Sequence, residues 1–434
     1  MSISLDNFKP HSLVAYLSSG NNNDLRIVFV DFETKKFIPS LVYCTSNVQK
    51  CVYEIPNMFK NKVKAVICHV SDLQTKDFDN NLSFCEMLKN ILSDYNIPNY
   101  FVSADQWLVS SLIIHARITD IKANEILLLG YVNDDFVATT EYCFTKNGYK
   151  KGPRENHNFS VNDNPENVRQ KILGTCKPKK ILLYCVSTGN ARMKYLRSQV
   201  LKSMNLVYLE TLFSLFRIGE NSAINEFVVE MTKWLLDKSY SKFYVFPSSD
   251  RHVVLFSLHG RFGEGTVIAP DVGEPLIVVH ELQCLPFTTS IIAKKPFAKY
   301  TLTCSTKTTT YANVPALAMM PHSEIYLNKK CHRSKITFTM DDENFPSCKT
   351  EPIIIDAIRD LPTTLKKTST KNPVIGFFDQ CSVICVFKSD SNEYEFLDDA
   401  DNNWNGMYGN ELLISFAKEK PVFGEKAKED LKVK

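Results

Sequence analysis

The chain has 434 residues, of which 44% are hydrophobic and 23% charged, as is typical of a folded protein with two or three domains. Its formal net charge of +3 is too small to indicate nucleic acid as the main partner. No segment has the run of about 18 apolar residues needed to cross a membrane, and residues 1–10 lack the pattern of a signal peptide.

The cysteines and histidines give no sign of a disulfide framework or a metal site. The thirteen cysteines are odd in number, and most lie inside apolar segments. No Cys-x-x-Cys pair occurs, and the nine histidines do not pair at ligand spacing. Cys331 and His332, beside two lysines, are expected at the surface. We expect reduced thiols, no metal and a cytoplasmic location, with the nucleus or a cytoplasmic granule as alternatives.

The first part of the chain predicts short strands that alternate with amphipathic helices. The strands are expected at residues 11–17, 25–32, 37–44, 51–55, 63–70 and 100–102. Two helices are expected to begin at Ser-x-x-Glu/Gln capping boxes that start with Ser83 and Ser103. This alternation indicates an α/β fold.

A second mixed region follows the same pattern. The expected elements are a hairpin at residues 125–132 and 136–144, a polar loop at 145–163, a helix from Pro165 to Gly174, a strand at 181–186, a helix from about 191 and a long helix at 221–237. The last helix carries a continuous apolar stripe and is expected to pack in a core.

Residues 180–200 form a strand–turn–helix segment that carries the most information about function. A small-residue turn at a helix N-terminus is a common place to bind an anion or a nucleotide. The turn reads Cys-Val-Ser-Thr-Gly-Asn-Ala-Arg over residues 185–192. It resembles the adenosine-binding Gly-Gly-Ser-Thr/Ser-Arg turn of the seventy-kilodalton heat-shock chaperones, but lacks the two leading glycines.

After about residue 242, helical periodicity gives way to short β-rich runs, which predict antiparallel sheets. The runs are expected at residues 243–246, 252–258, 275–282, 300–305, 335–340, 353–355, 374–378, 382–387 and 412–416. We expect domains at 1–240 (with lobes of about 1–120 and 121–240), 241–348 and 349–417, and a flexible charged tail at 418–434.

Further segments resemble the same chaperones, and they occur in the same order as in that family. Residues 14–22 and 126–138 resemble its two phosphate-binding segments, and residues 37–43 resemble a Thr-Pro-Ser strand. Residues 221–229 resemble a later helix, and residues 285–291 and 336–344 resemble parts of its β module. The resemblance implies a shortened α/β actin-like (ribonuclease H-like) N-terminal half, followed by an all-β C-terminal half of β-sandwich-like modules. It also implies that residues 241–348 correspond to a chaperone substrate-binding domain.

The chemical features that an actin-like ATPase needs are missing at the matching positions. Such an enzyme uses glycines to let backbone N–H groups approach phosphates, and carboxylates to hold Mg²⁺. Tyr16 or Leu17 stands at the acidic position of the first loop, and residues 131–133 replace the triple glycine of the second. Lys64 and His69 are poor counterparts of the family's catalytic lysine. The resemblance therefore implies a vestigial nucleotide cleft containing Ser19, Gly20, Gly130, Asp134, Gly189 and Arg192.

We therefore expect a non-catalytic, chaperone-like protein, a pseudo-ATPase without a cofactor that binds other proteins or peptides as a scaffold or adaptor. Aromatic residues often dominate interfaces, and the candidate contacts are Tyr300, Tyr311, Tyr326 and Trp404. One alternative is a nucleotide-dependent chaperone or ATPase that binds ATP and Mg²⁺ through Asp134, Asp135, Gly189 and Arg192. A nucleic-acid-associated scaffold is a second alternative, although the low net charge argues against nucleic acid as a direct ligand.

Overall fold

The chain forms two compact units. The computed structural model describes residues 5–20, 22–59, 61–210, 223–258, 273–294, 299–306, 320–326, 328, 330–399, 404–412, 414–415 and 422–423. Unit 1 contains Met1–Asp250 and two short later segments, Glu281–Pro286 and Asp341–Phe345. Unit 2 contains the remaining segments, Arg251–His280, Phe287–Met340 and Pro346–Lys434.

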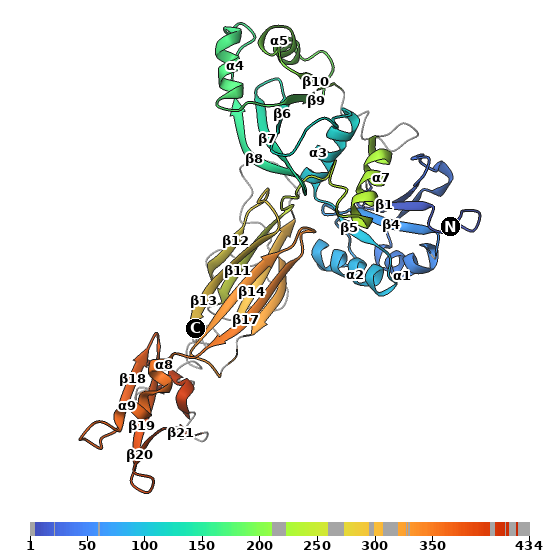
Figure 1. The fold of residues 1–434 in the computed structure, drawn as a ribbon. Helices are drawn as coiled ribbons and strands as arrows, with labels where there is room; N and C mark the ends of the chain where they lie inside the picture. Colours follow the sequence, from blue (N-terminus) through green and yellow to red (C-terminus); the bar gives the residue numbers. More distant parts are fainter. Residues whose placement is uncertain are drawn as a thin grey trace. The chain divides into compact units, whose positions relative to one another are not determined.

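The first sheet of unit 1 has five strands in the order β3-β2-β1-β4-β5 (Figure 1). The strands are β1 (Leu13–Ser19), β2 (Leu25–Asp31), β3 (Tyr43–Thr45), β4 (Val63–His69) and β5 (Asn99–Phe101). β1, β2 and β3 form an antiparallel meander, whereas β4 and β5 run parallel to β1. β1 and β4 are buried on both faces, which explains their nearly continuous apolar sequences.

The second sheet repeats this topology in the order β10-β9-β6-β7-β8. The strands are β6 (Ile126–Val132), β7 (Val137–Thr145), β8 (Gly148–His157), β9 (Lys180–Cys185) and β10 (Leu206–Leu209). β6, β7 and β8 form the antiparallel meander, and β9 and β10 run parallel to β6. A meander followed by parallel strands on the far side of the first strand is the ribonuclease H-like topology. Its duplication gives the actin-like fold predicted for the N-terminal half.

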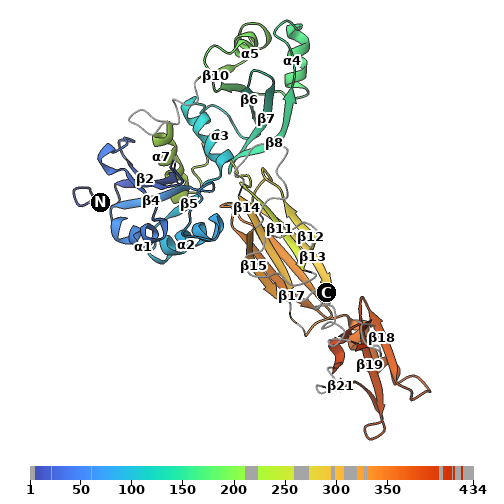
Figure 2. The same ribbon diagram turned by 180° about the vertical axis from the view of Figure 1, so that it is seen from behind.

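Helices cover both faces of each sheet in unit 1 (Figures 1 and 2). They are α1 (Val48–Phe59), α2 (Asn81–Asp94), α3 (Ala104–His115), α4 (Pro165–Leu173), α5 (Ala191–Tyr195) and α7 (Ala223–Leu236). α1 and α2 pack on one face of the first sheet, and α7 packs on the other. α4 and α5 cover one face of the second sheet, and α3 covers the other. α3 and α7 also contact each other, so each lobe supplies a helix to the middle of unit 1.

Several predictions for unit 1 are wrong. Residues 243–246, expected as a strand, form only an isolated bridge at Val245. Residues 51–55, expected as a strand, lie in α1, where Val48, Cys51, Val52, Ile55 and Phe59 are buried at helical spacing. Residues 148–157, expected in a loop, form the edge strand β8. Most of the central residues of β8 are exposed, and several are charged, as in an edge strand. The same composition is typical of a loop.

Side-chain caps define two helix starts. The Ser103 hydroxyl accepts a hydrogen bond from the Gln106 backbone N–H at 3.3 Å, as the predicted capping box requires. At α2 the cap is Asn80, whose side-chain oxygen accepts from the Ser83 N–H at 2.9 Å. The helix therefore begins before the predicted Ser83. Residues 37–44, expected as a strand, contain a 3₁₀ turn at Pro39–Leu41 that precedes β3.

Unit 2 is largely β, with antiparallel sheets in the orders β12-β11-β14-β15, β13-β16-β17 and β18-β19-β20, as predicted for the C-terminal half. The strands are β11 (Arg251–Leu258), β12 (Gly273–Val279), β13 (Phe287–Lys294), β14 (Lys299–Thr306), β15 (Met320–Tyr326), β16 (Arg333–Met340), β17 (Pro346–Ile353), β18 (Val374–Phe378), β19 (Cys381–Lys388) and β20 (Glu393–Phe396). The short helices α8 (Asp356–Arg359) and α9 (Leu361–Leu365) cover one face of the last sheet.

Cys331 and His332, expected at the surface, are buried inside unit 2. Nδ1 of His332 accepts a hydrogen bond from the Ile355 N–H at 2.8 Å, and Nε2 lies 2.8 Å from the Met407 carbonyl oxygen. Because Nδ1 is an acceptor, the ring is neutral and carries its hydrogen on Nε2. The imidazole thus connects the start of β16 to the segments that follow β17 and β22 (Trp404–Asn405).

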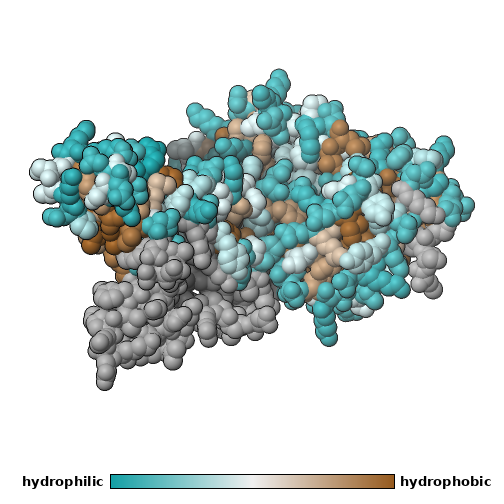
Figure 3. Space-filling model, turned by 90° about the horizontal axis from the view of Figure 1, so that it is seen from below, coloured by the Kyte–Doolittle hydropathy of each residue, from teal (hydrophilic) through white to brown (hydrophobic). Residues whose placement is uncertain are grey.

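The surface is mainly hydrophilic on the face drawn in Figure 3, where smaller apolar patches interrupt it. All thirteen cysteines are free. Within the described part of the chain, none of the helices combines the length and the apolar character needed to cross a membrane.

Candidate functional site

The residues predicted for a vestigial nucleotide cleft fall into two groups, one at each sheet of unit 1. Ser19 and Gly20 lie at the carboxyl end of β1. Asp134 lies in the β6–β7 turn, and Gly189 and Arg192 lie around the start of α5. The last three come together because the carboxyl ends of the parallel strands β6 and β9 are adjacent.

The first-lobe cluster consists of Tyr16, Ser19, His69, Asp72 and Trp107, around the carboxyl ends of β1 and β4. The Tyr16 hydroxyl lies 3.1 Å from Nδ1 of His69. The His69 ring stacks on Trp107, with ring centroids 4.6 Å apart and an interplanar angle of 21°. The Ser19 hydroxyl donates to Asp72 Oδ1 at 2.5 Å. The polar groups of this cluster thus form two hydrogen-bonded pairs, Tyr16 with His69 and Ser19 with Asp72.

Burial keeps two of these groups neutral near pH 7. It raises the pKa of Tyr16 far above its ordinary value, and the nearby charge of Asp72 adds to this effect. Burial lowers the pKa of His69 to about 4, although Asp72 acts in the opposite direction. Mg²⁺ requires hard oxygen ligands such as carboxylates, and a neutral phenol and imidazole do not meet that need. Asp72 is the one carboxylate of this cluster, and it accepts the Ser19 hydroxyl.

The second-lobe cluster consists of Asp134, Phe159, Asn190 and Arg192. The Asn190 side chain donates to Asp134 Oδ1 at 2.8 Å, and its oxygen accepts from the Met193 N–H at 2.9 Å. Arg192 Nε donates to the Asp134 carbonyl oxygen at 2.7 Å, and Arg192 Nη1 donates to the Phe159 carbonyl. The guanidinium also lies 5.2 Å from the centroid of the Phe159 ring. The one arginine predicted to stack on a base is thus bound to the protein's own backbone.

An open hollow of about 610 Å³ lies beside the second-lobe cluster. It is lined by Asp134, Asp135, Asn158, Phe159, Ser160, Val161, Ala191 and Arg192. Both aspartates are exposed, and the only cation in the lining is Arg192. A triphosphate placed here would meet two carboxylates, so the lining does not suit a polyanion.

The glycines predicted for the cleft have local structural roles. Gly130 is buried within β6, where an added Cβ would lie 2.5 Å from the Leu183 side chain, so it allows close packing of the two strands. Gly189 has a φ of +76° with nothing nearby, which favours glycine on backbone grounds. The Gly20 N–H donates to the Asp24 carbonyl at 2.7 Å. None of these arrangements requires a phosphate.

Comparison with known proteins supports no assignment beyond the fold. No protein-family model matches the chain, and no curated protein matches it. Similar solved structures include a Bacteroides thetaiotaomicron protein with an actin-like ATPase fold and unknown function, which is 11% identical over 48% of this chain and 94% of that chain, with a TM-score of 0.24. A Ppx/GppA phosphatase from Aquifex aeolicus is 9% identical over 40% of this chain and 67% of that chain, with a TM-score of 0.20. YeaZ from Pseudomonas aeruginosa is 10% identical over 52% of this chain and 95% of that chain, with a TM-score of 0.23.

These low scores carry no argument about function. The strand order and directions in the two sheets of unit 1 are what establish the actin-like fold. Among the described residues, no group of three or more His, Cys, Asp or Glu side chains is placed to hold a metal ion.

The predicted protein contacts have mixed outcomes. Tyr300, expected to be exposed, is buried in the central strand β14, so that expectation is wrong. Tyr326 is exposed. Tyr311 and the side chain of Trp404 lie outside the described residues. Two apolar residues of β18 that were not among the predicted contacts, Ile375 and Phe377, are 55% and 66% exposed. The sequence feature that could have indicated them is the apolar run at residues 374–378, which makes both faces of one strand hydrophobic.

Proposed function

We propose that this chain is a non-catalytic relative of the seventy-kilodalton heat-shock chaperones and acts as a protein-binding scaffold or adaptor. The order of its parts supports the proposal, because two ribonuclease H-like sheets precede a largely β region. The observation that carries it is the bonding of Arg192 and Asn190 to Asp134 and Phe159, which occupies the groups that a nucleotide would need.

Mg·ATP fits neither cluster of the candidate cleft. Entry of a phosphate chain at the second-lobe cluster would break several hydrogen bonds, each with a net contribution of about 1 kcal/mol. It would also bring negative charge beside Asp134 and Asp135. In the first-lobe cluster, the position that should hold a metal-binding carboxylate carries Tyr16. These features favour a pseudo-ATPase over the nucleotide-dependent alternative.

We expect 5 mM Mg·ATP, a concentration chosen on the order of cellular levels, to leave the thermal unfolding of the full chain unchanged. A ligand present at 100 times its dissociation constant would stabilise the protein by about 2.7 kcal/mol, which thermal unfolding readily detects. The measurement is a comparison of melting temperatures with and without Mg·ATP. Mg·tripolyphosphate at the same concentration is the control for non-specific effects of a polyanion.

The opposite outcome has a clear signature. Stabilisation by Mg·ATP but not by tripolyphosphate, abolished in an Arg192→Ala variant, would mean that the second-lobe cluster opens to bind nucleotide. The nucleotide-dependent alternative would then replace the pseudo-ATPase.

The surface best suited to a protein partner is the edge of β18. Among the residues that the structure describes, β18 pairs with β19 alone, so its other edge presents backbone donors and acceptors. Ile375 and Phe377 lie on the same face, because alternate residues of a strand point the same way. Of the lysines that precede the strand, Lys366 pairs with Glu393 and Lys371 donates to Asn392, whereas Lys367 is exposed and has no such contact with another described residue. We infer that the partner is an extended peptide segment that adds to this edge and carries apolar and acidic residues.

Peptides selected from a displayed random library on the full chain should bind through this edge. We expect a Phe377→Asn variant to bind them about tenfold more weakly, because truncating a central aromatic contact often costs 1 kcal/mol or more. Fluorescence anisotropy with a labelled selected peptide measures the dissociation constants.

A Tyr326→Asn variant is the matched control, since Tyr326 is equally exposed but lies on β15. Peptides that bind the Phe377→Asn variant as tightly as the unmodified chain would exclude β18 as the contact. A similar loss in both variants would exclude it as well.

A further inference from the structure

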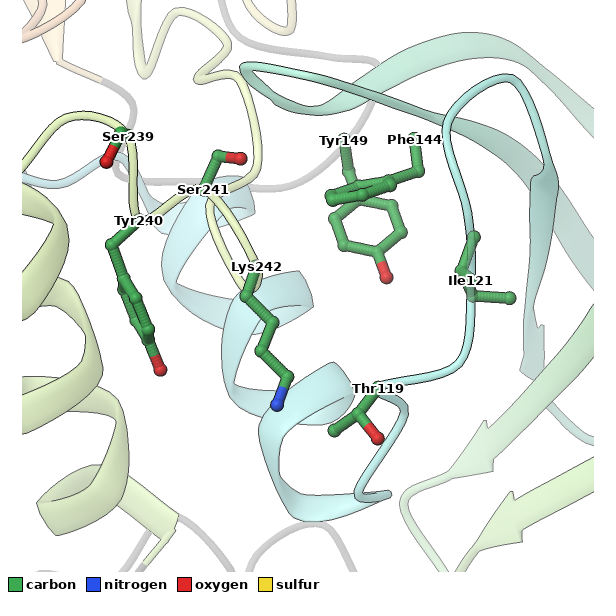
Figure 4. Close-up of a pocket in the computed structure, with 8 residues that line it drawn as sticks. All are labelled: Thr119, Ile121, Phe144, Tyr149, Ser239, Tyr240, Ser241 and Lys242. Carbon is green, nitrogen blue, oxygen red and sulfur yellow. The ribbon is translucent and has the colours of Figure 1, made fainter.

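A second hollow in unit 1 lies away from both cleft clusters. Its volume is about 280 Å³, and it is lined by Thr119, Ile121, Phe144, Tyr149, Ser239, Tyr240, Ser241 and Lys242 (Figure 4). These residues come from the α3–β6 loop, the β7–β8 hairpin and the loop after α7. Three separate segments of unit 1 therefore build one small concavity.

Three polar groups of this lining are not occupied by other parts of the protein. The Ser239 and Ser241 hydroxyls donate to Asp237 and to the Lys146 carbonyl, and Tyr240 donates to Glu230. By contrast, no hydrogen bond or ion pair to another described residue engages the side chain of Thr119, the Tyr149 hydroxyl or the Lys242 ammonium group. The centroid of the Phe243 ring lies 5.1 Å from Lys242 Nζ.

Tyr149 is the most informative of the three groups. Its residue is only 2% exposed, so a hydroxyl without a partner is costly unless the hollow supplies one. Figure 4 shows this hydroxyl directed into the space between Lys242 and Ile121, with the Lys242 side chain extending toward Thr119. Burial raises the pKa of Tyr149, and Asp120 adds to the effect, so the hydroxyl stays protonated and can donate.

Lys242 and Thr119 are exposed to solvent, and no carboxylate in the described part of the chain pairs with Lys242. Lys180, Lys151 and Lys233 each form an ion pair with a carboxylate at 2.7–2.9 Å. The nearest acidic neighbour of Thr119 is Asp120, which is held by Lys180 at 2.7 Å. Among the described residues, Lys242 has no such carboxylate. An ammonium group and two hydroxyl groups thus face a space whose walls include the apolar side chains of Ile121 and Phe144.

We propose that this hollow binds a carboxylate carried on a small apolar group. The Lys242 ammonium would pair with the carboxylate, and Tyr149 and Thr119 would donate hydrogen bonds to its oxygens. Ile121 and Phe144 would contact the apolar part. Two sources share this chemistry, a free aliphatic acid and the C-terminal residue of a peptide. The site is separate from the vestigial cleft, so the proposal stands whether or not Mg·ATP binds there.

The test uses ligand-observed NMR titration of the full chain with three probes. We expect 4-methylpentanoate and N-acetylleucine to bind with a dissociation constant of about 1 mM, a weak affinity typical of so small a contact. N-acetylleucinamide, which lacks the carboxylate, should bind at least about tenfold more weakly. If N-acetylleucine binds at least about tenfold more tightly than 4-methylpentanoate, the source is a peptide terminus, and equal binding identifies a free acid.

Substitutions distinguish specific binding at this site from non-specific attraction of anions to lysines. Lys242→Met keeps the aliphatic stem and should weaken binding of N-acetylleucine at least about tenfold, and Tyr149→Phe should weaken it about threefold. Lys146→Met removes the same charge from an exposed residue outside the lining and should change nothing. The proposal is wrong if no acid binds, if the amide binds as well as the acid, or if Lys242→Met and Lys146→Met behave alike.

Discussion

Replacing Gly148 by alanine is expected to destabilise unit 1 by about 4 kcal/mol. Gly148 has a φ of +127°, which residues with a side chain rarely adopt. An added Cβ would also lie 2.5 Å from the carbonyl oxygen of Tyr244 and 2.7 Å from its ring. That oxygen accepts the Tyr149 N–H at 2.8 Å, so it cannot move away without breaking the bond. The variant must therefore give up the pairing between the start of β8 and residues 244–246.

Urea denaturation followed by tryptophan fluorescence measures this loss, because Trp107 and Trp234 lie in α3 and α7 of unit 1. Gly189→Ala is the matched control. Gly189 also has a positive φ, +76°, but no atom lies within 4 Å of the added Cβ. It should cost only about 1 kcal/mol, the strain of the backbone alone. Equal losses of unfolding free energy in the two variants would show that the close approach to Tyr244 does not contribute to the destabilisation.

The sheets of unit 1 could be predicted because their inner strands are buried on both faces. β1, β4, β6 and β9 are almost uniformly apolar, and such short runs between polar turns indicate strands. The edge strand β8 could not be predicted in this way. It contains two glycines, a proline and several charged residues, since its outer edge pairs with residues 244–246 at Tyr149 but not along the rest of its length.

The segment in α1 was misread for a different reason. Residues 51–55 read Cys-Val-Tyr-Glu-Ile, a short run rich in apolar and β-branched residues that resembles a strand, and Pro56 argues against a helix interior. The helix nevertheless forms, because Val48, Val52, Ile55 and Phe59 together cover the first sheet. Tertiary packing here overrides local preference. A longer window over residues 48–59 would have shown the helical spacing.

The candidate cleft could be predicted in part. The turn residues Asp134 and Arg192 were identified separately, and the pairing of Val132 with Cys185 in parallel strands brings them together. The hydrogen bonds that engage Arg192 could not be predicted, since one of them is to the carbonyl of Phe159, which lies in the segment after β8. The burial of Tyr300 could not be predicted either, because it also depends on tertiary structure. Its strand lies between β11 and β15 with a covered face, and strand position cannot be read from one run of residues.

Replacing Glu230 by glutamine is expected to destabilise unit 1 by about 3 kcal/mol at pH 7, because it breaks a buried ion cluster. Glu230 lies on α7 with its side chain 5% exposed. Its carboxylate accepts hydrogen bonds from Lys35 and Lys233, both at 2.9 Å, and from the Tyr240 hydroxyl. A glutamine amide would present its own N–H donors to these donors and leave two lysine charges without a counter-ion.

The pH dependence of this effect has a definite sign. Burial alone raises the pKa of Glu230, but the hydrogen bonds from Tyr240, Lys35 and Lys233 outweigh it and hold the pKa below its usual value. The folded state therefore favours the ionised carboxylate. Its contribution is fully present above the unfolded pKa of about 4.3 and is lost as the pH falls through the lower folded pKa. The difference between the urea midpoints of the two proteins should be largest at pH 7 and should shrink as the pH falls below about 4.

Glu226→Gln is the control on the same helix, one turn earlier. Glu226 accepts from Arg117 at 2.9 Å, but Arg117 is 71% exposed, so the loss should stay within about 0.5 kcal/mol. Lys35 follows β2 in the first lobe, whereas α7 follows β10 of the second lobe in the chain. The Glu230 cluster thus joins parts of unit 1 that are far apart in sequence. A gap between the Glu230 variant and the unmodified chain that is as large at pH 3 as at pH 7, or equal losses at both positions, would show that another interaction makes this connection.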